Sequence, residues 1–437
     1  MLRVAVDVAA ANATVNVTVI QGGCVMPDTV VIIGAGLAGL SCADRLHSAG
    51  VPVRVVDAAD EVGGRVRTDI VDGFRLDRGF QVFNTAYPEA ARVLDIGALD
   101  LRAIPSGVIT FEKGRKERFM LPWRHPRHAF SGLLADVGSL RDKAALSALT
   151  ARDITFPPEL LRRDPDRTTE EELRHRGISS KMIEKLIRPF LAGVFLEREL
   201  ETSSRFFNLI WRSFALGTVG VPALGMGEIP RQLAARLPRG TLKLGTPVIA
   251  VTDEGVETAM GEAIGARTVV VATDPAMAAA LYPGLEIPQM RAVTTFYHAV
   301  PWSPADDPTQ IVDAEGQITD TLVITDAAPE YSSDGRALVS TSVLGLLSDA
   351  DEPRVRARLA QIYRANTSAW EHLATYPIEA ALPAMTPPFP MRRPVRFAPG
   401  RYVCGDHRDT GSHQGALVSG RRAADAVLDD LRSAGRK

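Results

Sequence analysis

Three absences narrow the class of protein to which this chain of 437 residues can belong. It carries 50 basic and 52 acidic residues, and this near balance gives no electrostatic reason to expect a nucleic acid as partner. Its only cysteines are Cys24, Cys42 and Cys404, so no disulfide framework is predicted and a reducing, cytoplasmic compartment is favoured. It has no run of about 18 apolar residues, so no membrane-spanning helix is predicted.

Residues 1–25 precede Met26 and the first predicted strand of the fold. Valines alternate with other residues there as they do in strands, but Asp7, Asn12 and Asn16 interrupt any signal-peptide core. We expect an upstream extension with no role in the fold, and an added edge strand is the alternative.

The most informative stretch of the chain is residues 29–40, which combine a strand, a glycine-rich turn and the start of a helix. A short apolar run predicts a buried parallel strand, and glycines at G-x-G-x-x-G spacing follow it. Helical spacing continues to about Ala49, and a second strand over residues 53–56 ends at Asp57. In such a unit the glycines allow a tight turn and the approach of a pyrophosphate to the helix N-terminus. The acid can accept hydrogen bonds from ribose hydroxyls, so the unit predicts dinucleotide binding.

A second glycine cluster, Gly63-Gly64, follows the acid directly and leads into Arg65. Its backbone can approach a bulky group, and the planar guanidinium suits a phosphate. A domain that binds only a nicotinamide dinucleotide has no need for this second phosphate-binding segment. Residues 30–67 as a whole resemble the N-terminal signature of the flavin amine oxidase superfamily. That superfamily includes monoamine oxidases, protoporphyrinogen oxidases and phytoene desaturases, and its members bind FAD.

The resemblance assigns roles to two further segments of the FAD-binding half. Residues 73–83 match a segment that passes beside the flavin ring, which makes Gly79, Phe80 and Gln81 neighbours of the ring. Their alternating pattern is also that of a plain hairpin, which is the alternative. Residues 242–249 read as one strand, and in relatives the backbone of its valine, here Val248, meets the adenine.

The chain closes with Gly405-Asp406 after a strand and with a helix that begins near Gln414. In the superfamily the acid holds a ribityl hydroxyl, and the helix N-terminus faces the flavin ring and stabilises negative charge on it. A competing interpretation is a metal site made by Asp406, His407, Asp409 and His413, which their spacing allows. We favour the flavin interpretation and predict no metal. The complete set of predicted cofactor-binding residues is Gly34, Ala35, Gly36, Leu37, Ala38, Gly39, Asp57, Ala58, Gly64, Arg65, Gly79, Phe80, Gln81, Val248, Gly405, Asp406, Gln414, Gly415 and Ala416.

The sequence departs from the amine oxidases at two positions of their pattern. A lysine that often follows the strand ending near Ala272 is missing from residues 274–281. Ser412 stands where many amine oxidases place an aromatic residue of a cage for the amine. Both departures favour a larger, mostly apolar substrate. Cys404 directly precedes the Gly-Asp pair and not the position of covalent attachment, so FAD is predicted to be non-covalent.

The middle of the chain, residues 101–216, is predicted to be largely helical and is rich in arginine. Within it, residues 119–130 mix aromatic and basic side chains, which allows peripheral contact with an anionic membrane surface. The alternative is a proline-broken loop of a cap domain. His125 and His128 have the spacing of metal ligands, but no matching acid or cysteine cluster follows.

The predicted fold class is α/β, with a Rossmann-type FAD-binding domain and an inserted α+β substrate domain. The FAD-binding domain comprises residues 26–105, 217–285 and 395–437, and the substrate-binding domain comprises residues 106–216 and 286–394. The predicted function is removal of hydride from a C–H of a largely apolar small molecule, by oxidation or desaturation, with transfer to flavin N5. The alternatives are an amine oxidase that yields an imine and hydrogen peroxide, a non-redox flavin-dependent isomerase, and a non-catalytic flavin-binding protein. No catalytic acid or base is assigned.

Overall fold

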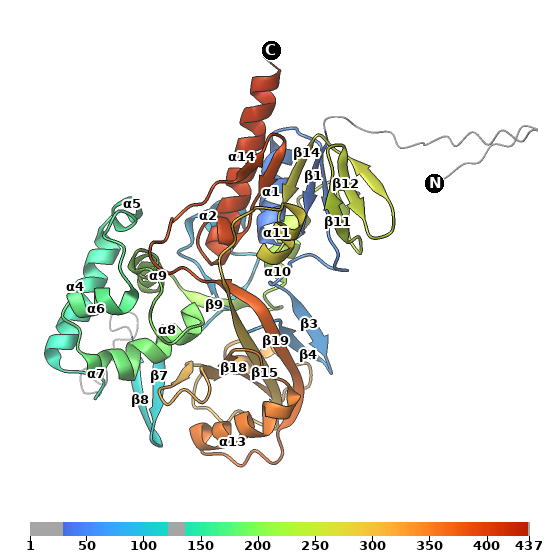
Figure 1. Ribbon diagram of the computed structural model, residues 1–437. Coiled ribbons are helices and arrows are strands. Elements are labelled where there is room, and N and C mark those ends of the chain that lie inside the picture. The colour runs from blue at the N-terminus through green and yellow to red at the C-terminus, as the bar shows by residue number, and fades with distance from the viewer. Residues whose placement is uncertain (1–28, 121–135, 436–437) are drawn as a thin grey trace, which may run out of the picture.

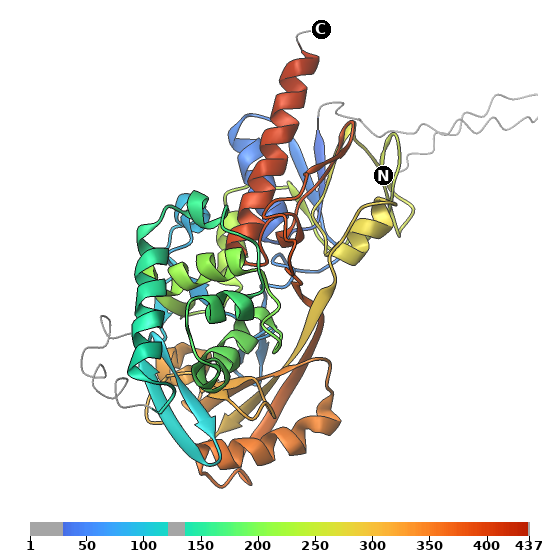
Figure 2. The same cartoon turned by 60° about the vertical axis from the view of Figure 1, so that its left-hand side comes forward.

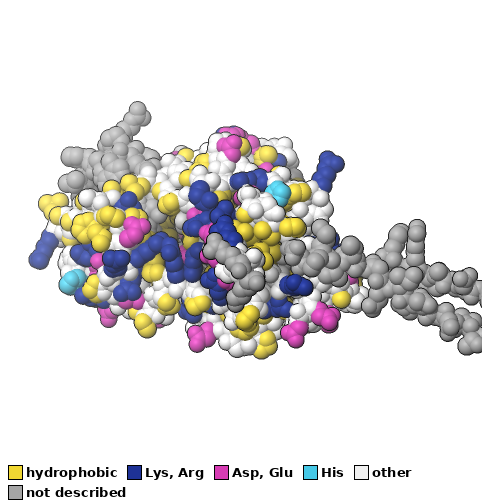
Figure 3. Space-filling view, turned by 90° about the horizontal axis from the view of Figure 1, so that it is seen from above, with side chains coloured by type: hydrophobic (Ala, Val, Ile, Leu, Met, Phe, Trp, Pro, Cys, Tyr) yellow, Lys and Arg dark blue, Asp and Glu magenta, His cyan; other side chains and the backbone are white. Residues whose placement is uncertain are grey.

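The computed structural model describes residues 29–120 and 136–435 (Figure 1). The predicted extension, residues 1–25, and all but the first two residues of segment 119–130 lie outside the described residues, as do His125 and His128. Within the described ranges, no helix has the length and apolar character needed to cross a membrane. Seen from above, one face shows a band of Lys and Arg side chains with hydrophobic and acidic side chains around it (Figure 3).

The upper part of the molecule is built on a six-stranded sheet in which the glycine-rich unit supplies two interior strands. The strand order is β10 (Leu242–Lys243), β2 (Val53–Val56), β1 (Val30–Ile33), β14 (Thr268–Val271), β21 (Arg401–Val403) and β20 (Arg396–Ala398). All neighbours are parallel except β20 and β21. β1 is buried along its whole length, as its unbroken β-branched sequence predicts for a parallel strand covered on both faces.

Two helices from opposite ends of the sequence pack together beside this sheet (Figure 1). They are α1 (Leu37–Ser48) and the long C-terminal helix α14 (His413–Ala434). At Gly420 a Cβ atom would lie 2.1 Å from the carbonyl oxygen of Ala38, so glycine is required for the two backbones to approach this closely. The C-terminal helix thereby completes the upper part of the fold.

A second, seven-stranded sheet forms the lower part of the molecule. Its order is β19 (Glu371–Pro383), β15 (Met290–Val300), β18 (Ala337–Leu344), β17 (Asp320–Val323), β16 (Ile311–Asp313), β7 (Gly107–Glu112) and β8 (Arg115–Met120). One face packs on α13 (Glu352–Tyr363) through an apolar cluster that includes Phe111, Phe296 and Leu359. The other face contributes Val108 and Val312 to a core shared with a group of helices.

That group of helices flanks the seven-stranded sheet and forms a cap (Figure 2). It consists of α4 (Leu140–Thr155), α5 (Pro158–Leu161), α6 (Thr169–His175), α7 (Ser180–Met182), a π-helical turn (Ile183–Ile187), α8 (Arg188–Phe195) and α9 (Ser204–Leu216). Capping boxes at Ser139 and Thr168 fix the starts of α4 and α6.

Short elements connect these layers. One small sheet pairs β3 (Thr68–Val71) with β4 (Phe74–Asp77). A second places β9 (Val219–Pro222) between β5 (Phe83–Asn84) and β6 (Leu101–Ala103). A third consists of β11 (Val248–Val251), β12 (Gly255–Thr258) and β13 (Ala263–Gly265). The other α-helices of the described residues are α2 (Pro88–Val93), α10 (Glu228–Ala234), α11 (Pro275–Leu281) and α12 (Ile324–Ala327), and short 3₁₀ helices lie at Pro329–Tyr331, Asp349–Asp351 and Asp406–Arg408.

The α/β fold class is as predicted, but two local predictions are wrong. Residues 101–216 are not helical throughout, because β6, β7 and β8 lie in their first part and the last two strands pair with each other. Residues 242–249 do not form one strand, since β10 joins the six-stranded sheet and β11 a small separate sheet. The break falls at Gly245, which adopts φ +62, and at the following Thr246-Pro247.

Candidate functional site

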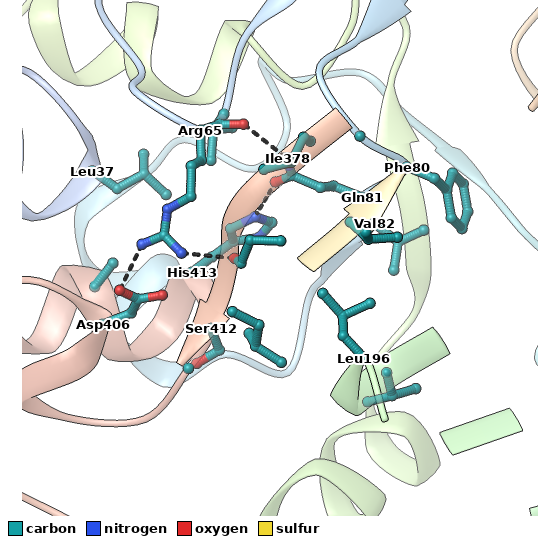
Figure 4. A pocket seen from close by; sticks show the side chains of 18 of the residues that line it. Leu37, Arg65, Phe80, Gln81, Val82, Leu196, Ile378, Asp406, Ser412 and His413 are labelled. Carbon is teal, nitrogen blue, oxygen red and sulfur yellow. Dashed lines mark hydrogen bonds and ion pairs between the residues drawn. The ribbon is translucent and has the colours of Figure 1, made fainter. Parts of the chain in front are cut away.

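A cavity of about 720 Å³ runs from the glycine-rich turns of the upper sheet to the helical cap. This volume lies in the range of about 300–1,000 Å³ that is usual for ligand and cofactor sites. The half beside the six-stranded sheet is lined by turns and helix ends, and the other half by the seven-stranded sheet and the cap. Side chains from both halves point toward a common space in Figure 4.

The two glycine clusters of the sequence lie side by side at one end of this cavity. Gly36 forms a bridge with Gly63, whose amide donates a 2.9 Å hydrogen bond to the carbonyl oxygen of Ala35. Gly36 is the N-cap of α1, and no side chain among the described residues caps that end of the helix. The backbone N–H groups of the first turn therefore have no helical acceptor and can bind an anion.

Asp57 is held at the edge of the cavity by backbone donors on both of its oxygens. Its Oδ2 accepts from the amide of Ala35 at 2.5 Å and its Oδ1 from the amide of Ala59 at 2.7 Å. Each carboxylate oxygen retains a further lone pair, so this fixed, half-buried acid can still accept from ligand hydroxyls.

Arg65 and Asp406 form an ion pair that joins the N-terminal and C-terminal segments at the cavity (Figure 4). The Arg65 Nη2 atom lies 2.6 Å from Asp406 Oδ1, and Nη1 donates to the carbonyl oxygen of Ala381 at 2.7 Å. The carboxyl of Asp406 is almost fully buried, whereas about a third of the Arg65 side chain is exposed. Arg65, which is predicted to bind a phosphate, and Asp406, which is predicted to bind a ribityl hydroxyl, are thus direct partners.

Gln81 and His413 continue this polar network toward the centre of the cavity (Figure 4). Gln81 donates through Nε2 to the carbonyl oxygen of Arg65 at 2.8 Å, so its Oε1 is free to accept from His413 Nε2 at 3.0 Å. Burial and the nearby Arg65 cation lower the pKa of His413 to about 4, so the imidazole is neutral near pH 7. The sequence makes His413 a candidate for the alternative metal site alone, and no sequence signal places it beside Gln81.

Most of the predicted cofactor-binding residues line the cavity. These are Gly34, Gly36, Leu37, Ala38, Asp57, Ala58, Gly64, Arg65, Gly79, Phe80, Gln81, Val248, Gly405, Asp406 and Ala416. Ala35, Gly39, Gln414 and Gly415 lie behind the lining. A Cβ atom on Gly39 would lie 1.9 Å from the Gly34 carbonyl oxygen, so Gly39 serves the packing of helix on strand. The Gln414 side chain accepts from the amide of Glu89.

The four side chains of the alternative metal site do not converge. Asp406 pairs with Arg65, Asp409 with Arg422, and His413 with Gln81. Both ring nitrogens of the buried His407 lack a hydrogen-bond partner in the described part of the chain, and burial lowers its pKa to about 4. Within residues 29–120 and 136–435, no group of three or more His, Cys, Asp or Glu side chains is arranged to hold a metal ion.

The cap half of the cavity is a predominantly apolar chamber. Its lining includes Leu186, Phe190, Val194, Ile210, Trp211 and Phe214. The Phe190 ring packs edge-on against Phe214, with 5.3 Å between ring centroids, and against Trp211 at 6.3 Å. In the sequence these side chains have the helical spacing of ordinary core residues, so only the structure separates the chamber from the core.

The chain belongs to the family described as flavin containing amine oxidoreductase, whose model matches residues 37–428. It is therefore a flavin-dependent oxidoreductase, and the residues of the cavity fit such a cofactor. The uncapped start of α1 offers donors for a pyrophosphate, the adjoining glycines leave room for it, and Asp57 can accept from a ribose.

Particular relatives differ in the substrates that their names state. The chain is 26% identical over 447 residues to a hydroxysqualene dehydroxylase of Rhodopseudomonas palustris, covering 92% of this chain and 99% of that protein. It is 28% identical over 272 residues to a putrescine oxidase of Kocuria rosea, covering 56% and 53% of the two chains. A solved structure from Exiguobacterium sp. 255-15, provisionally described as a protoporphyrinogen oxidase, superposes with a TM-score of 0.71 at 17% identity and covers 93% and 100% of the chains.

Proposed function

We propose that the chain binds FAD non-covalently and removes hydride from a C–H of a largely apolar small molecule, by oxidation or desaturation. The observation that carries this proposal is the continuity of one cavity from the paired glycine turns to an apolar chamber. A flavin whose pyrophosphate met α1 would place its ring toward Gly79, Gln81 and Ser412, where the chamber begins.

Non-covalent binding is supported by the position of the cysteines. Cys42 and Cys404 are fully buried, and neither lines the cavity. Burial raises the pKa of the Cys404 thiol to about 12, which leaves it protonated and a poor nucleophile.

In this proposal the protein supplies position, field and exclusion of water, while bound flavin accepts the hydride equivalent from the substrate carbon. The cap helices hold the apolar part of the substrate. Ser412 accepts from the Gly415 amide at 3.0 Å and so fixes the first turn of α14, whose N-terminus faces the cavity. That N-terminus favours negative charge developing on a group bound there.

The hydroxysqualene dehydroxylase and protoporphyrinogen oxidase names support an apolar substrate, and the putrescine oxidase name supports amine oxidation instead. The missing lysine and the presence of Ser412 favour the apolar substrate. In the segment that lacks the lysine, Asp274 follows β14 and caps α11 by accepting a hydrogen bond from the Met277 amide. A flavin-dependent isomerase or a non-catalytic flavin-binding protein would use the same cavity without net oxidation of a substrate.

The test is anaerobic mixing of purified protein with amines, porphyrinogens and polyenes while the visible absorbance of the flavin is followed. We expect bleaching by an apolar substrate and none by primary amines. Phe214→Ala, which enlarges the chamber, should slow that bleaching. Phe397→Ala is the control, because Phe397 stacks on Tyr282 outside the cavity lining. Bleaching by amines alone would replace this proposal with amine oxidation, and no bleaching by any compound would favour an isomerase or a non-catalytic flavin-binding protein.

The cytoplasmic location and the absence of a nucleic acid partner stay predictions from composition. The same holds for peripheral membrane contact through residues 119–130. Division into an FAD-binding and a substrate-binding domain at the predicted boundaries is likewise part of the proposal. It is supported by two sheets whose strands come from the two sets of segments.

A further inference from the structure

One acidic side chain faces the apolar chamber without a charged partner. Asp320 lies on β17, is 2% exposed and lines the cavity. Its Oδ1 atom has no hydrogen-bond partner among the described residues. An unsatisfied polar atom in an apolar site costs about 1–3 kcal/mol, so its presence calls for an explanation.

Two other buried acids of the described chain are paired with arginines. Asp313 contacts Arg358, and Asp153 contacts Arg152. No ion pair involves Asp320 in the described parts of the chain. Its polar neighbours are the uncharged side chains of Gln310 and Ser342, which also line the cavity.

The Asp320 carboxyl group is packed closely on the side of the helical cap. Gly193 of α8 faces it, and a Cβ atom there would lie 2.8 Å from Asp320 Oδ2. Burial raises the pKa of Asp320 to about 7, against the opposing effect of Gln310 and Ser342, so a large share of the carboxyl is protonated near neutral pH. A neutral carboxyl can both donate to and accept from an uncharged oxygen.

The sheet register sets the distance of Asp320 from the flavin half. Asp320 pairs with Ser342, Ser342 with Thr295, and Thr295 with Tyr376, so the row crosses from β17 to β19. The two strand spacings from β17 to β15 amount to roughly 10 Å, and the third, to β19, brings the distance to roughly 14 Å. The cofactor side of the cavity meets this sheet at β15 and β19: the amide of Phe80 donates to Thr295 Oγ1 at 3.2 Å, and a Cβ atom on Gly79 would lie 2.6 Å from Ile378. Asp320 is therefore placed to bind the far part of a substrate and not the reacting carbon.

We propose that Asp320, with Gln310 and Ser342, binds a hydroxyl or other uncharged oxygen carried at the far end of an otherwise apolar substrate. This inference rests on the proposed function and narrows its substrate class. Asp320 acts as a specificity-determining residue, since it holds the substrate in register and takes no part in hydride removal. The unpaired Oδ1 atom and the cavity-lining side chains of Gln310 and Ser342 are then parts of one subsite.

Equilibrium dialysis of the flavin-loaded protein with radiolabelled 1-octanol, octane and octylamine tests this subsite without relying on turnover. We expect the wild type to bind octanol about tenfold more tightly than octane, as one buried hydrogen bond allows. Asp320→Leu should abolish this preference, whereas Asp320→Asn, which keeps hydrogen-bonding capacity, should retain most of it. Gly193→Ala, whose Cβ atom would lie 2.8 Å from Oδ2 and displace the carboxyl group, should reduce octanol binding several-fold and octane binding much less.

Three results would overturn the inference. The first is equal binding of octanol and octane by the wild type. The second is an octanol preference that survives in both Asp320→Leu and Gly193→Ala. The third is a preference for octylamine that both Asp320 variants lose, because that would assign the carboxyl to a cation. Failure of the proposed function is seen separately, as absence of flavin or of bleaching in protein that still distinguishes octanol from octane.

Discussion

Substitution of Gly36 by alanine separates cofactor binding from folding at the turn that begins α1. Gly36 has φ −75 and ψ 178, which alanine adopts without strain. A Cβ atom there would meet only the carbonyl oxygen of Gly63, at 3.9 Å. We therefore expect Gly36→Ala to keep the stability of the cofactor-free protein or to raise it by about 0.4–1 kcal/mol, because alanine restricts the unfolded chain.

The same methyl group would project into the cavity where the pyrophosphate is proposed to lie. Hydrogen bonds to a charged group contribute about 1.5–3 kcal/mol each. Displacement of the phosphate from one such donor should thus weaken FAD binding about ten- to hundredfold. The assay is titration of apoprotein with FAD, followed by flavin fluorescence, beside thermal unfolding of each apoprotein.

Gly97→Ala is the matched control, because a Cβ atom there meets the Asp95 side chain at an ordinary 3.4 Å and Gly97 does not line the cavity. It should leave FAD affinity unchanged. A folded Gly36→Ala protein with wild-type FAD affinity would refute the placement of the pyrophosphate at this turn.

Three further predictions concern the cofactor and the lower sheet. Asp406→Asn should bind FAD moderately less well and Asp406→Ala much less, because alanine also removes the carboxylate that pairs with Arg65 at 2.6 Å. A stoichiometric metal in the wild type, together with undisturbed FAD binding in Asp406→Ala, would contradict this prediction. Acid precipitation should release all flavin into the supernatant, and flavin in the pellet would disprove non-covalent binding. Glu352→Gln should lower the free energy of unfolding at pH 7 by about 1–2 kcal/mol in urea titrations, because the charged carboxylate accepts from Arg356 and contacts His298 Nε2 at 2.8 Å. Hydrogen bonds from His298 and Arg356 lower the pKa of Glu352 from 4.5 to about 2. The carboxylate therefore stabilises the fold above pH 4.5, and this contribution is lost as pH falls toward 2. A destabilisation by Glu352→Gln that does not change with pH would contradict this role of the carboxylate.

The half of the fold that is built on the six-stranded sheet was predictable because its signals are local. The buried run of β1, the turn glycines and Asp57 lie within one short unit, and each has a single physical role. The family resemblance then located Asp406 and the start of α14, and the structure brings both to the cavity. The contact of Arg65 with Asp406 joins residues 341 positions apart and had no local signal.

The substrate half was less predictable because tertiary pairing decides its structure. The sequence of β19 does not predict a strand, because Pro377 interrupts it. In the structure, nearly all of its residues have intermediate or high exposure. It forms because β15 offers a long antiparallel partner. Asp320 likewise has no distinguishing sequence context, and only the packing of α8 over β17 makes it a buried acid in a ligand chamber.

The most direct test of the central claim is a crystal structure of the protein purified with its flavin. We predict that the pyrophosphate lies within hydrogen-bonding distance of the first-turn amides of α1, with the ring between Gly79 and Ser412 and the apolar chamber open to its face. Flavin bound elsewhere, or a ring separated from the chamber, would contradict the proposal that one cavity joins cofactor and substrate.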